Sequence, residues 1–310
     1  MIEIVFLGTS ASAPSIHRGL SAQMVLYKDY RFLVDCGEGT QRQILRSGLG
    51  FKRLNRILLT HGHLDHILGL GGLISTFARW EATGGIEIYG GGWALERVYD
   101  LIYGVVLRGA EPPIKIDFIE VRPGVVLEDD TFELVAFPVV HRGPCLGYLF
   151  REKPRRPFLA DKADALGVPQ GPERRRLVGG ESVTLADGRV IRPDDVLGPP
   201  RLGACLAHVG DAGRIDNLKA AVRGADMLAI EATYLQREAD MARRFAHLTA
   251  ARAARLARDA GVHRLVLTHI SRRYREADIL DEACSVFPET VVARDFDHFR
   301  VLRRGVERED

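Results

Sequence analysis

The sequence has few cysteines and no long apolar run, and each shortage excludes a class of protein. Its 310 residues include four cysteines, and no two of them share the short spacing of a CxxC zinc site or a disulfide framework. No apolar run approaches the roughly 20 residues that cross a bilayer, so we expect no membrane span. The N-terminus opens on a strand-like run without a basic leader, which predicts a cytoplasmic protein.

Charge is unevenly distributed along the chain. The formal net charge is only +2, yet residues 151–176 contain eight Lys or Arg against four Asp or Glu. Proline and glycine are frequent from residue 151 to about 200, and no sustained apolar period occurs there. Such a segment is typical of an excursion from a globular core, and its basic side chains would be the first to meet a nucleic acid.

Strand-like apolar runs dominate the rest of the chain. In the first half they cover residues 2–7, 22–27, 32–35, 56–60, 115–121, 131–137 and 145–150. In the second half strands are predicted at 203–209, 225–231, 264–269, 290–295 and 298–302. Helices are predicted to start within 67–74, at 93–102, and over 249–260, where Gly261 would end the helix. This order predicts two mixed β-sheets flanked by helices in a single domain spanning 1–310, with residues 151–200 inserted.

Residues of metal-ligand type gather where the predicted strands end. The set is His61, His63, Asp65, His66, His141, Asp211 and His269. Four of them fall within the six residues HGHLDH, a density that isolated core or surface histidines do not produce. The other three, taken singly, could be ordinary core or surface residues, and the cluster makes them candidate ligands. Loops at strand ends are held rigidly yet face an open cleft, as a catalytic metal requires.

The local spacing indicates how two ions could be shared. His61 and His63 are two residues apart, so in an extended segment they point to the same side and can bind one ion. Asp65 and His66 follow where the chain turns and can reach a second ion, and Asp211 is the natural bridging carboxylate. Imidazole nitrogen and carboxylate oxygen suit zinc, with manganese and iron as weaker alternatives.

HGHLDH is similar to the HxHxDH signature of the metallo-β-lactamase superfamily, and the later ligands fall in that family's order. The resemblance implies an αβ/βα sandwich, with two zinc ions per subunit held between sheet edges. As the resemblance implies, the ligands of one zinc are His61, His63 and His141, those of the other are Asp65, His66 and His269, and the bridge is Asp211.

Further segments resemble the ribonuclease Z family, whose members process the 3′ ends of tRNA. FLGTSASAPSIHRG and LVDCGEGTQRQIL resemble the family's opening, and Glu231-Ala232-Thr233, His247-Leu248-Thr249 and residues 267–274 resemble later motifs. The family's homodimer, in which the arm of one subunit holds tRNA for the active site of the other, is implied as well.

The inserted segment is similar to the protruding tRNA-binding arm of that family. Candidate RNA contacts there are Arg155, Arg156, Gly171, Pro172, Arg174, Arg175 and Arg176. A solvated basic loop is the alternative. Arg273, which follows the last ligand, could also meet a phosphate, or it could be a surface charge.

The predicted chemistry is two-metal hydrolysis of a phosphodiester, which needs charge neutralisation and a nucleophile at neutral pH. The leaving 3′ oxygen also needs a proton, and His247 is the best candidate donor. Glu231 could orient the other ring nitrogen of His247 and keep the ring charged. The candidate catalytic residues are therefore Asp65, His247 and Glu231. The predicted reaction cleaves the phosphodiester between the tRNA and its 3′ trailer and leaves a 3′-hydroxyl on the tRNA.

The chain departs from the family at a few positions. Ile230, Leu248 and Ala212 replace the usual histidine, serine and threonine, although none is a predicted ligand. Residues 75–92, STFARWEATGGIEIYGGG, lack the family's Ser/Arg-rich sequence, so the resemblance does not extend to recognition of the RNA 3′ end.

Three functions remain open on the sequence. The first is the tRNA 3′-endonuclease. The second is a hydrolase of small phosphodiesters or esters with the same fold. The third is a metal-stabilised RNA-binding protein without turnover, although structural zinc sites rarely keep two ions with open positions.

Overall fold

The structure is a computed structural model that describes residues 1–80, 84–112 and 114–309. It divides the chain into two compact units, Met1–Arg151 with Ala204–Asp310, and Glu152–Gly203. Every predicted metal ligand belongs to the first unit. Within the divergent segment 75–92, residues 81–83 lie outside the described residues.

A mixed sheet of eight strands forms one half of the first unit, counted over the described residues. In spatial order its strands are β17 (Gly305–Glu309), β16 (His298–Leu302), β1 (Ile2–Gly8), β2 (Ala22–Tyr27), β3 (Tyr30–Val34), β4 (Arg56–Leu58), β5 (Gly85–Gly90) and β6 (Lys115–Glu120). The strands from β17 to β3 pair antiparallel, and those from β3 to β6 pair parallel.

A second mixed sheet forms the other half. Its seven described strands, in spatial order, are β15 (Thr290–Val292), β14 (Arg264–Thr268), β13 (Met227–Glu231), β12 (Cys205–Val209), β9 (Gly143–Glu152), β8 (Phe132–His141) and β7 (Gly124–Glu128). The strands from β12 to β15 run parallel, while β9 pairs antiparallel with β12, and β7 with β8.

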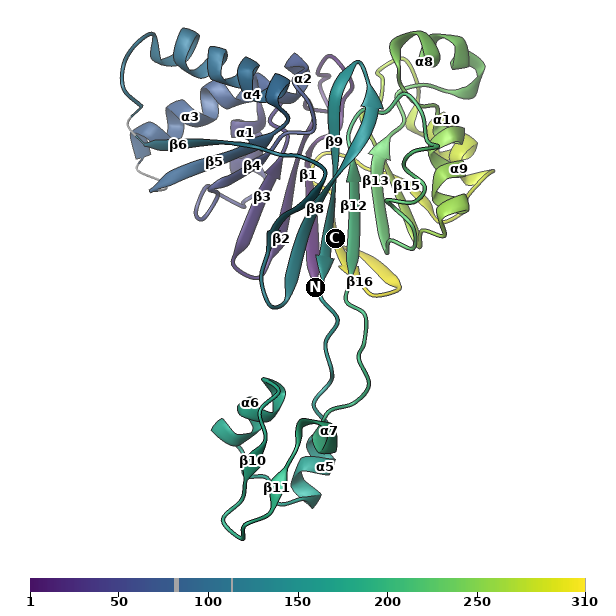
Figure 1. Cartoon of the computed structure of the whole chain (residues 1–310). Coiled ribbons are helices and arrows are strands. Elements are labelled where there is room, and N and C mark those ends of the chain that lie inside the picture. Colours follow the sequence, from purple (N-terminus) through teal and green to yellow (C-terminus); the bar gives the residue numbers. More distant parts are fainter. Residues whose placement is uncertain (81–83, 113, 310) are drawn as a thin grey trace. The chain divides into compact units, whose positions relative to one another are not determined.

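Three apolar layers show that the two sheets face each other and that helices cover their outer faces (Figure 1). Along β1, Ile2, Ile4 and Phe6 enter the layer between the sheets, whereas Val5 and Leu7 pack toward the helices. This alternation follows from the two-residue period of a strand. The helices on that side are α1 (Thr40–Arg46), α3 (Gly69–Trp80) and α4 (Gly92–Tyr99), and those on the far side are α9 (Ala250–Ala260) and α10 (Glu276–Cys284). The predicted αβ/βα sandwich is confirmed.

The helix ends follow local sequence signals. Thr249 caps α9, its hydroxyl accepting a hydrogen bond from the backbone N–H of Arg252, and Gly261 ends the helix with a φ of 66°. The helix predicted at 93–102 is α4 followed by a π-helix, η1 (Asp100–Leu107). The remaining helical segments of the first unit are α2 (Leu64–Ile67), η2 (Gln236–Glu238) and α8 (Ala239–Phe245). Within the described ranges, every helix is too short or too polar to cross a membrane.

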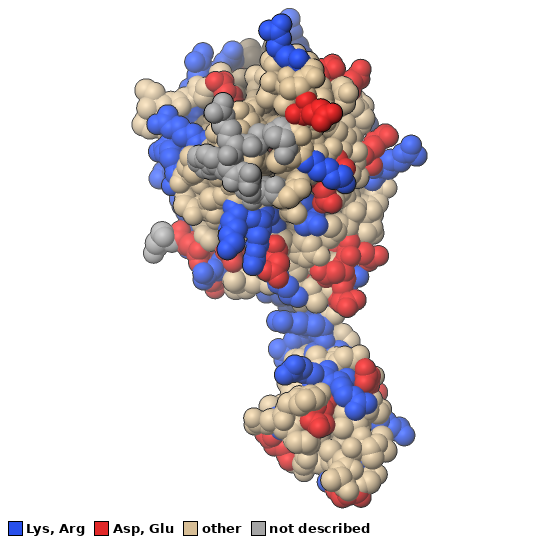
Figure 2. All heavy atoms as spheres, turned by 90° about the vertical axis from the view of Figure 1, so that its left-hand side faces the viewer, with Lys and Arg blue, Asp and Glu red and all other residues tan. Residues whose placement is uncertain are grey.

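The second unit contains α5 (Ala160–Ala165), α6 (Pro172–Val178), β10 (Val183–Thr184), β11 (Val190–Ile191) and α7 (Pro193–Val196). It has a small apolar cluster of its own, to which Ala163, Leu177 and Val183 contribute. Single residues from several short elements build this cluster, and for that reason no apolar period is visible in the sequence. In Figure 2, Lys and Arg side chains gather over one end of this unit.

Candidate metal centre

The segment HGHLDH leaves the first sheet just after β4 and turns into α2. His63 has an extended backbone, with φ −68° and ψ 150°, and immediately precedes α2. Its Nδ1 lies 2.8 Å from Nε2 of His61. Asp65 and His66 fall in the single turn of α2 and point their side chains to a second position. The backbone of this motif directs His61 and His63 to one position and Asp65 and His66 to another, the arrangement that the spacing predicts.

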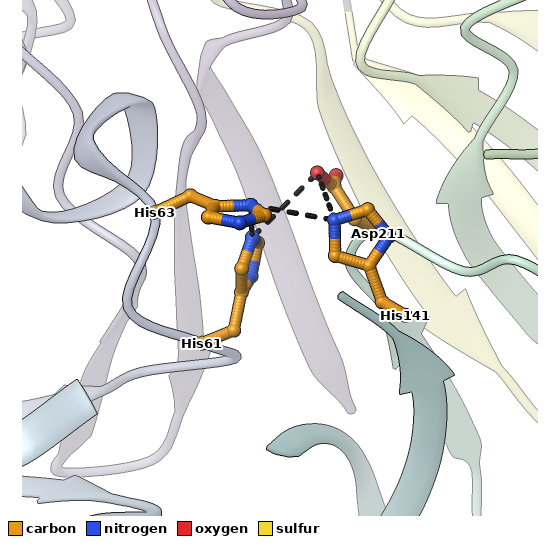
Figure 3. A group of neighbouring side chains, drawn as sticks. All are labelled: His61, His63, His141 and Asp211. Carbon is orange, nitrogen blue, oxygen red and sulfur yellow. Dashed lines mark hydrogen bonds and ion pairs between the residues drawn. The ribbon is translucent and has the colours of Figure 1, made fainter. Parts of the chain in front are cut away.

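Three imidazoles and one carboxylate converge in the first group, which Figure 3 shows. His141 ends β8, and Asp211 follows β12. Nε2 of His141 lies 3.3 Å from Nδ1 of His63. Oδ2 of Asp211 lies 3.6 Å from Nε2 of both His61 and His141. One donor atom from each of the four residues lies within 4.8 Å of all the others.

The second group consists of Asp65, His66 and His269. Oδ2 of Asp65 lies 3.4 Å from Nε2 of His269 and 3.8 Å from Nε2 of His66. Asp211 approaches this group with its other oxygen, Oδ1, which is 3.5 Å from Nε2 of His66 and 3.4 Å from Nδ1 of His269. Asp211 therefore faces the two groups with different carboxylate oxygens.

Two buried atoms of the centre lack hydrogen-bond partners among the described residues. They are Nε2 of His66 and Oδ1 of Asp211. Leaving such a group unsatisfied in a protein interior costs about 1–3 kcal/mol. A cation shared by these atoms would remove that cost, and nitrogen and carboxylate donors are those that zinc prefers. The residues present fit a pair of divalent ions.

The surroundings hold most of these imidazoles neutral, as metal ligands must be. Burial, reinforced by neighbouring histidines, lowers the pKa of His61 well below its ordinary value and that of His63 to about 4. Burial also lowers the pKa of His141. His66 differs, because the carboxylates around it, Asp211 foremost, outweigh burial and raise its pKa. A cation bound at its Nε2 would take the place of that proton.

Asp35 holds the start of the HGHLDH segment through hydrogen bonds. Its carboxylate accepts hydrogen bonds from the backbone N–H and the hydroxyl of Thr60, both at 2.8 Å, and from Nδ1 of His66 at 2.7 Å. It is 1% exposed, so these donors replace water around a buried charge. Asp35 thus links the residue before the HGHLDH segment to a candidate ligand within it. Hydrogen bonds of this kind fix the orientation of a ligand.

Other ligands are also held in place by neighbours. Nδ1 of His141 donates to the backbone carbonyl of Ala246 at 2.6 Å, which leaves Nε2 as its free donor atom. The backbone N–H of Ser12 donates to Oδ2 of Asp65 at 3.0 Å. The hydroxyl of Thr233 lies 2.9 Å from Nδ1 of His269.

Three residues at the centre have a strained backbone. Asp35, Ala246 and His269 all have φ between 54° and 57°, in the left-handed region that side chains other than glycine seldom adopt. Each costs of order 1 kcal/mol and persists only where the surrounding structure enforces it. Here each strained residue either provides a candidate ligand or binds one.

His247 and Glu231 form a buried pair beside the ligands. Nδ1 of His247 lies 2.9 Å from Oε1 of Glu231 and 3.9 Å from Oδ2 of Asp211. Glu231 is fully buried and also accepts from the backbone N–H of Ala212 at 2.6 Å. Burial opposes charge on His247, but these two carboxylates outweigh it and raise its pKa to about 9. The two carboxylates thus favour the protonated ring next to the ligand groups.

The three positions that depart from the resemblance are not candidate ligands. Ile230, Ala212 and Leu248 are all fully buried and belong to one apolar cluster beneath the second sheet.

The remaining predicted contacts are distributed over both units. Arg155, Arg156, Gly171, Pro172 and Arg174–Arg176 belong to the unit Glu152–Gly203. Arg273 belongs to the first unit, where its guanidinium lies 3.0 Å from Sδ of Met241 and 4.0 Å from Glu238. His208 is 1% exposed, and its Nε2 donates to the side-chain oxygen of Gln23.

Two features of the centre were not found by sequence reasoning. Thr60 contacts Asp35 and also lies 3.0 Å from Nδ1 of His61. Trp93 meets the ring of His63 edge-on, with 5.6 Å between centroids. Position next to a ligand was a signal for Thr60, but nothing local links Trp93 to a residue 30 positions earlier.

Comparison with known proteins agrees with this geometry. A model of the metallo-beta-lactamase superfamily matches residues 19–159, and a model of the beta-lactamase superfamily domain matches residues 200–270. The crystal structure of the short form of human tRNase Z is similar, with a TM-score of 0.67, 26% sequence identity, and coverage of 96% of this chain and 99% of that one.

Curated relatives match nearly the whole chain. Ribonuclease Z of Bradyrhizobium sp. (strain ORS 278) is 47% identical over 302 residues, covering 97% of this chain and 100% of the relative. Ribonuclease Z of Listeria monocytogenes serovar 1/2a (strain ATCC BAA-679 / EGD-e) is 39% identical over 307 residues, covering 97% and 99%. With this similarity over nearly its whole length, and with the metal-ligand groups of the fold, the chain belongs to the ribonuclease Z family of metallo-β-lactamase-fold proteins.

Proposed function

We propose that this protein is a zinc-dependent endoribonuclease that removes 3′ trailers from precursor tRNAs. The observation that carries the proposal is the position of Asp211, whose two oxygens face separate groups of histidine and aspartate ligands while His247 lies alongside. Membership of the ribonuclease Z family makes the chain a metal-dependent endoribonuclease. The choice of zinc, of two ions and of this RNA substrate are parts of the proposal.

The first ion would be held by His61, His63 and His141, the second by Asp65, His66 and His269, and both by Asp211. When bound, such a pair supplies charge neutralisation for the phosphate and a water nucleophile at neutral pH. The protein contributes the rigid placement of the ligands on strand ends of both sheets. A Cβ on Gly210 would stand 2.8 Å from Oγ1 of Thr60, so glycine allows the Asp211 turn to approach the HGHLDH segment this closely.

Departure of the 3′ oxygen requires a proton, and His247 is positioned to donate it. Glu231 binds Nδ1 of that ring, which leaves Nε2 as the nitrogen that can deliver a proton to substrate. A donor that remains charged at neutral pH is ready when negative charge develops on the leaving oxygen. Glu231 acts through His247, as a positioning residue.

The unit Glu152–Gly203 is the proposed RNA-binding arm, and the structure separates its arginines into two kinds. Arg156, Arg174 and Arg176 form ion pairs with Asp194, Asp164 and Glu181 of the same unit. The guanidinium groups of Arg155, Arg175 and Arg201 are exposed and make no ion pair or hydrogen bond with the described residues. The unpaired arginines are available to bind phosphates. The paired arginines link segments of the arm to one another.

We further propose a homodimer. Exposed apolar side chains lie on α2, α4 and η1 and on the turn after α2: Leu64, Leu68, Tyr99 and Val105 are 49%, 39%, 52% and 67% exposed. A contiguous patch of such side chains would be a candidate protein interface. Light scattering should give twice the mass of the chain, and Val105→Glu should shift the protein toward the monomer. A monomeric parent protein would overturn this part.

The function is tested with a precursor tRNA that carries a 3′ trailer. Zinc-loaded protein should release the trailer and leave a 3′-hydroxyl on the tRNA, and chelation should abolish cleavage. Rapid turnover of a small chromogenic phosphodiester without trailer cleavage would instead indicate a general hydrolase. Tight RNA binding without cleavage of either substrate would indicate a binding protein.

A further inference from the structure

Trp93 is brought to the metal centre by glycines on both sides of the contact. It follows Gly90-Gly91-Gly92 at the start of α4. A Cβ on Gly90 would stand 3.2 Å from Cβ of Leu59, and one on Gly62 would stand 3.1 Å from Cα of Ala94. Larger residues would hold the start of α4 away from the HGHLDH segment. The indole is therefore placed against the ligand loop by backbone packing.

The indole itself contacts the loops that carry two ligands. Its edge-on contact with His63 joins it to the first ligand group. A Cβ on Gly143, two residues after His141, would stand 3.5 Å from Cζ3 of the indole. Trp93 remains partly exposed, and the guanidinium of Arg97 lies 5.6 Å from its ring centroid. An open aromatic surface and a cation thus stand together at the edge of the candidate centre.

Four rings follow one another along this edge of the candidate centre. His247 lies 4.9 Å from His141, His141 lies 5.0 Å from His63, and His63 lies 5.6 Å from Trp93, measured between ring centroids. The proton donor and the indole stand at opposite ends of the row. Since the leaving 3′ oxygen stays with the body of the tRNA, the body lies toward His247. The other end of the row is then the trailer side.

We propose that Trp93 stacks on the base of the first trailer nucleotide and that Arg97 neutralises the phosphate that follows it. This inference rests on the proposed function, because it requires an RNA strand across the centre. Stacking on an aromatic side chain tolerates any base, since every base has a π-face. Trp93 would position the scissile phosphate without reading the trailer sequence.

The experiment couples a protein change to a substrate change. Single-turnover cleavage by zinc-loaded protein is measured on two precursor tRNAs that differ only in an abasic site at the first trailer nucleotide. Loss of the base should slow the parent protein about tenfold, the scale of one stacking contact. Trp93→Leu should be slowed by a similar factor on the normal substrate and should be indifferent to the abasic site. Trp93→Phe should keep most of the coupling.

Phe245→Ala is the matched control, because Phe245 is also partly exposed and lies 5.1 Å from a guanidinium, that of Arg142, but stands two residues before His247 in the chain. It should leave the abasic effect intact. Binding without cleavage gives a second measurement: 2-aminopurine at the first trailer position should be quenched by metal-free parent protein and not by Trp93→Leu.

The outcomes separate this inference from the function on which it rests. Failure of the parent protein to cleave the trailer would refute the function. Normal cleavage with no abasic effect, or equal abasic effects in the parent and Trp93→Leu, would refute the role of Trp93. Loss of zinc from Trp93→Leu would show that the indole only supports His63.

Discussion

Nδ1 of His247 lies 2.9 Å from Oε1 of Glu231, a carboxylate with no exposed surface. A buried carboxylate is costly unless it is hydrogen-bonded, and Glu231 is also bound by Ala212 and Thr233. Because these contacts hold Glu231 in place, the ring of His247 is held as well. Proton donation from a fixed position is the property that the proposed cleavage needs.

Replacing His247 with alanine should slow trailer cleavage by about 10²–10⁴-fold, the usual contribution of a general acid. Zinc content should not change, since neither ligand group needs His247. Cleavage rates and metal analysis of the same preparation check both statements. His208→Gln, at a buried histidine outside the ligand groups, is the control for loss of an imidazole. Metal loss from His247→Ala would instead make His247 a ligand.

Asp35→Asn should weaken metal binding at the second group by about 10–100-fold, the usual effect of removing a partner that orients a ligand. The amide keeps the shape of the carboxylate but removes its charge beside His66. Competition with a chromogenic zinc chelator measures the affinity. Asp226→Asn is the matched control, because Asp226 is equally buried but binds Cys205 and Arg303. It should lower stability without changing metal affinity, and equal metal affinities in all three proteins would contradict the role given to Asp35.

Arg175→Ala should weaken binding of precursor tRNA and lower the salt dependence of binding by about one phosphate contact. Hydrolysis of a small phosphodiester should be unaffected. Arg174→Ala is a useful contrast, since Arg174 pairs with Asp164 and donates to the carbonyl of Val168 at 2.8 Å. That variant should loosen the arm and increase its proteolysis. An unchanged salt dependence in Arg175→Ala would exclude a phosphate contact there.

We expect the free energy of unfolding to decrease in mild acid because of the buried His208. Burial lowers its pKa to about 4, so the folded protein resists protonation while the unfolded chain protonates near 6.5. Its contribution is complete above pH 6.5 and is lost as the pH falls toward 4, by about 3 kcal/mol in total. Urea unfolding of chelated protein measures this loss, and His208→Gln should depend less steeply on pH. Parallel pH profiles for the two proteins would refute the assignment.

The elements that were predicted correctly depend on local rules. Alternating apolar residues place Ile2, Ile4 and Phe6 on one face of a strand in any sheet, and Thr249 with Gly261 marks the ends of a helix wherever it packs. The HGHLDH segment belongs to the same class, because an extended pair followed by a helical turn separates its four side chains into two positions. These features were available from the sequence since each one is decided within a few residues.

Other features depend on how distant segments pack. The sequence offered Asp211 as a bridge, but only the meeting of two sheets places its oxygens toward His61 and His66. Which arm arginines are paired, and the contact of Trp93 with His63, likewise depend on neighbours that no spacing along the chain reveals. The sequence alone determined the residue types and the local geometry of the centre. Tertiary structure decided which of these side chains share a point in space, because such distances depend on the packing of whole sheets and helices.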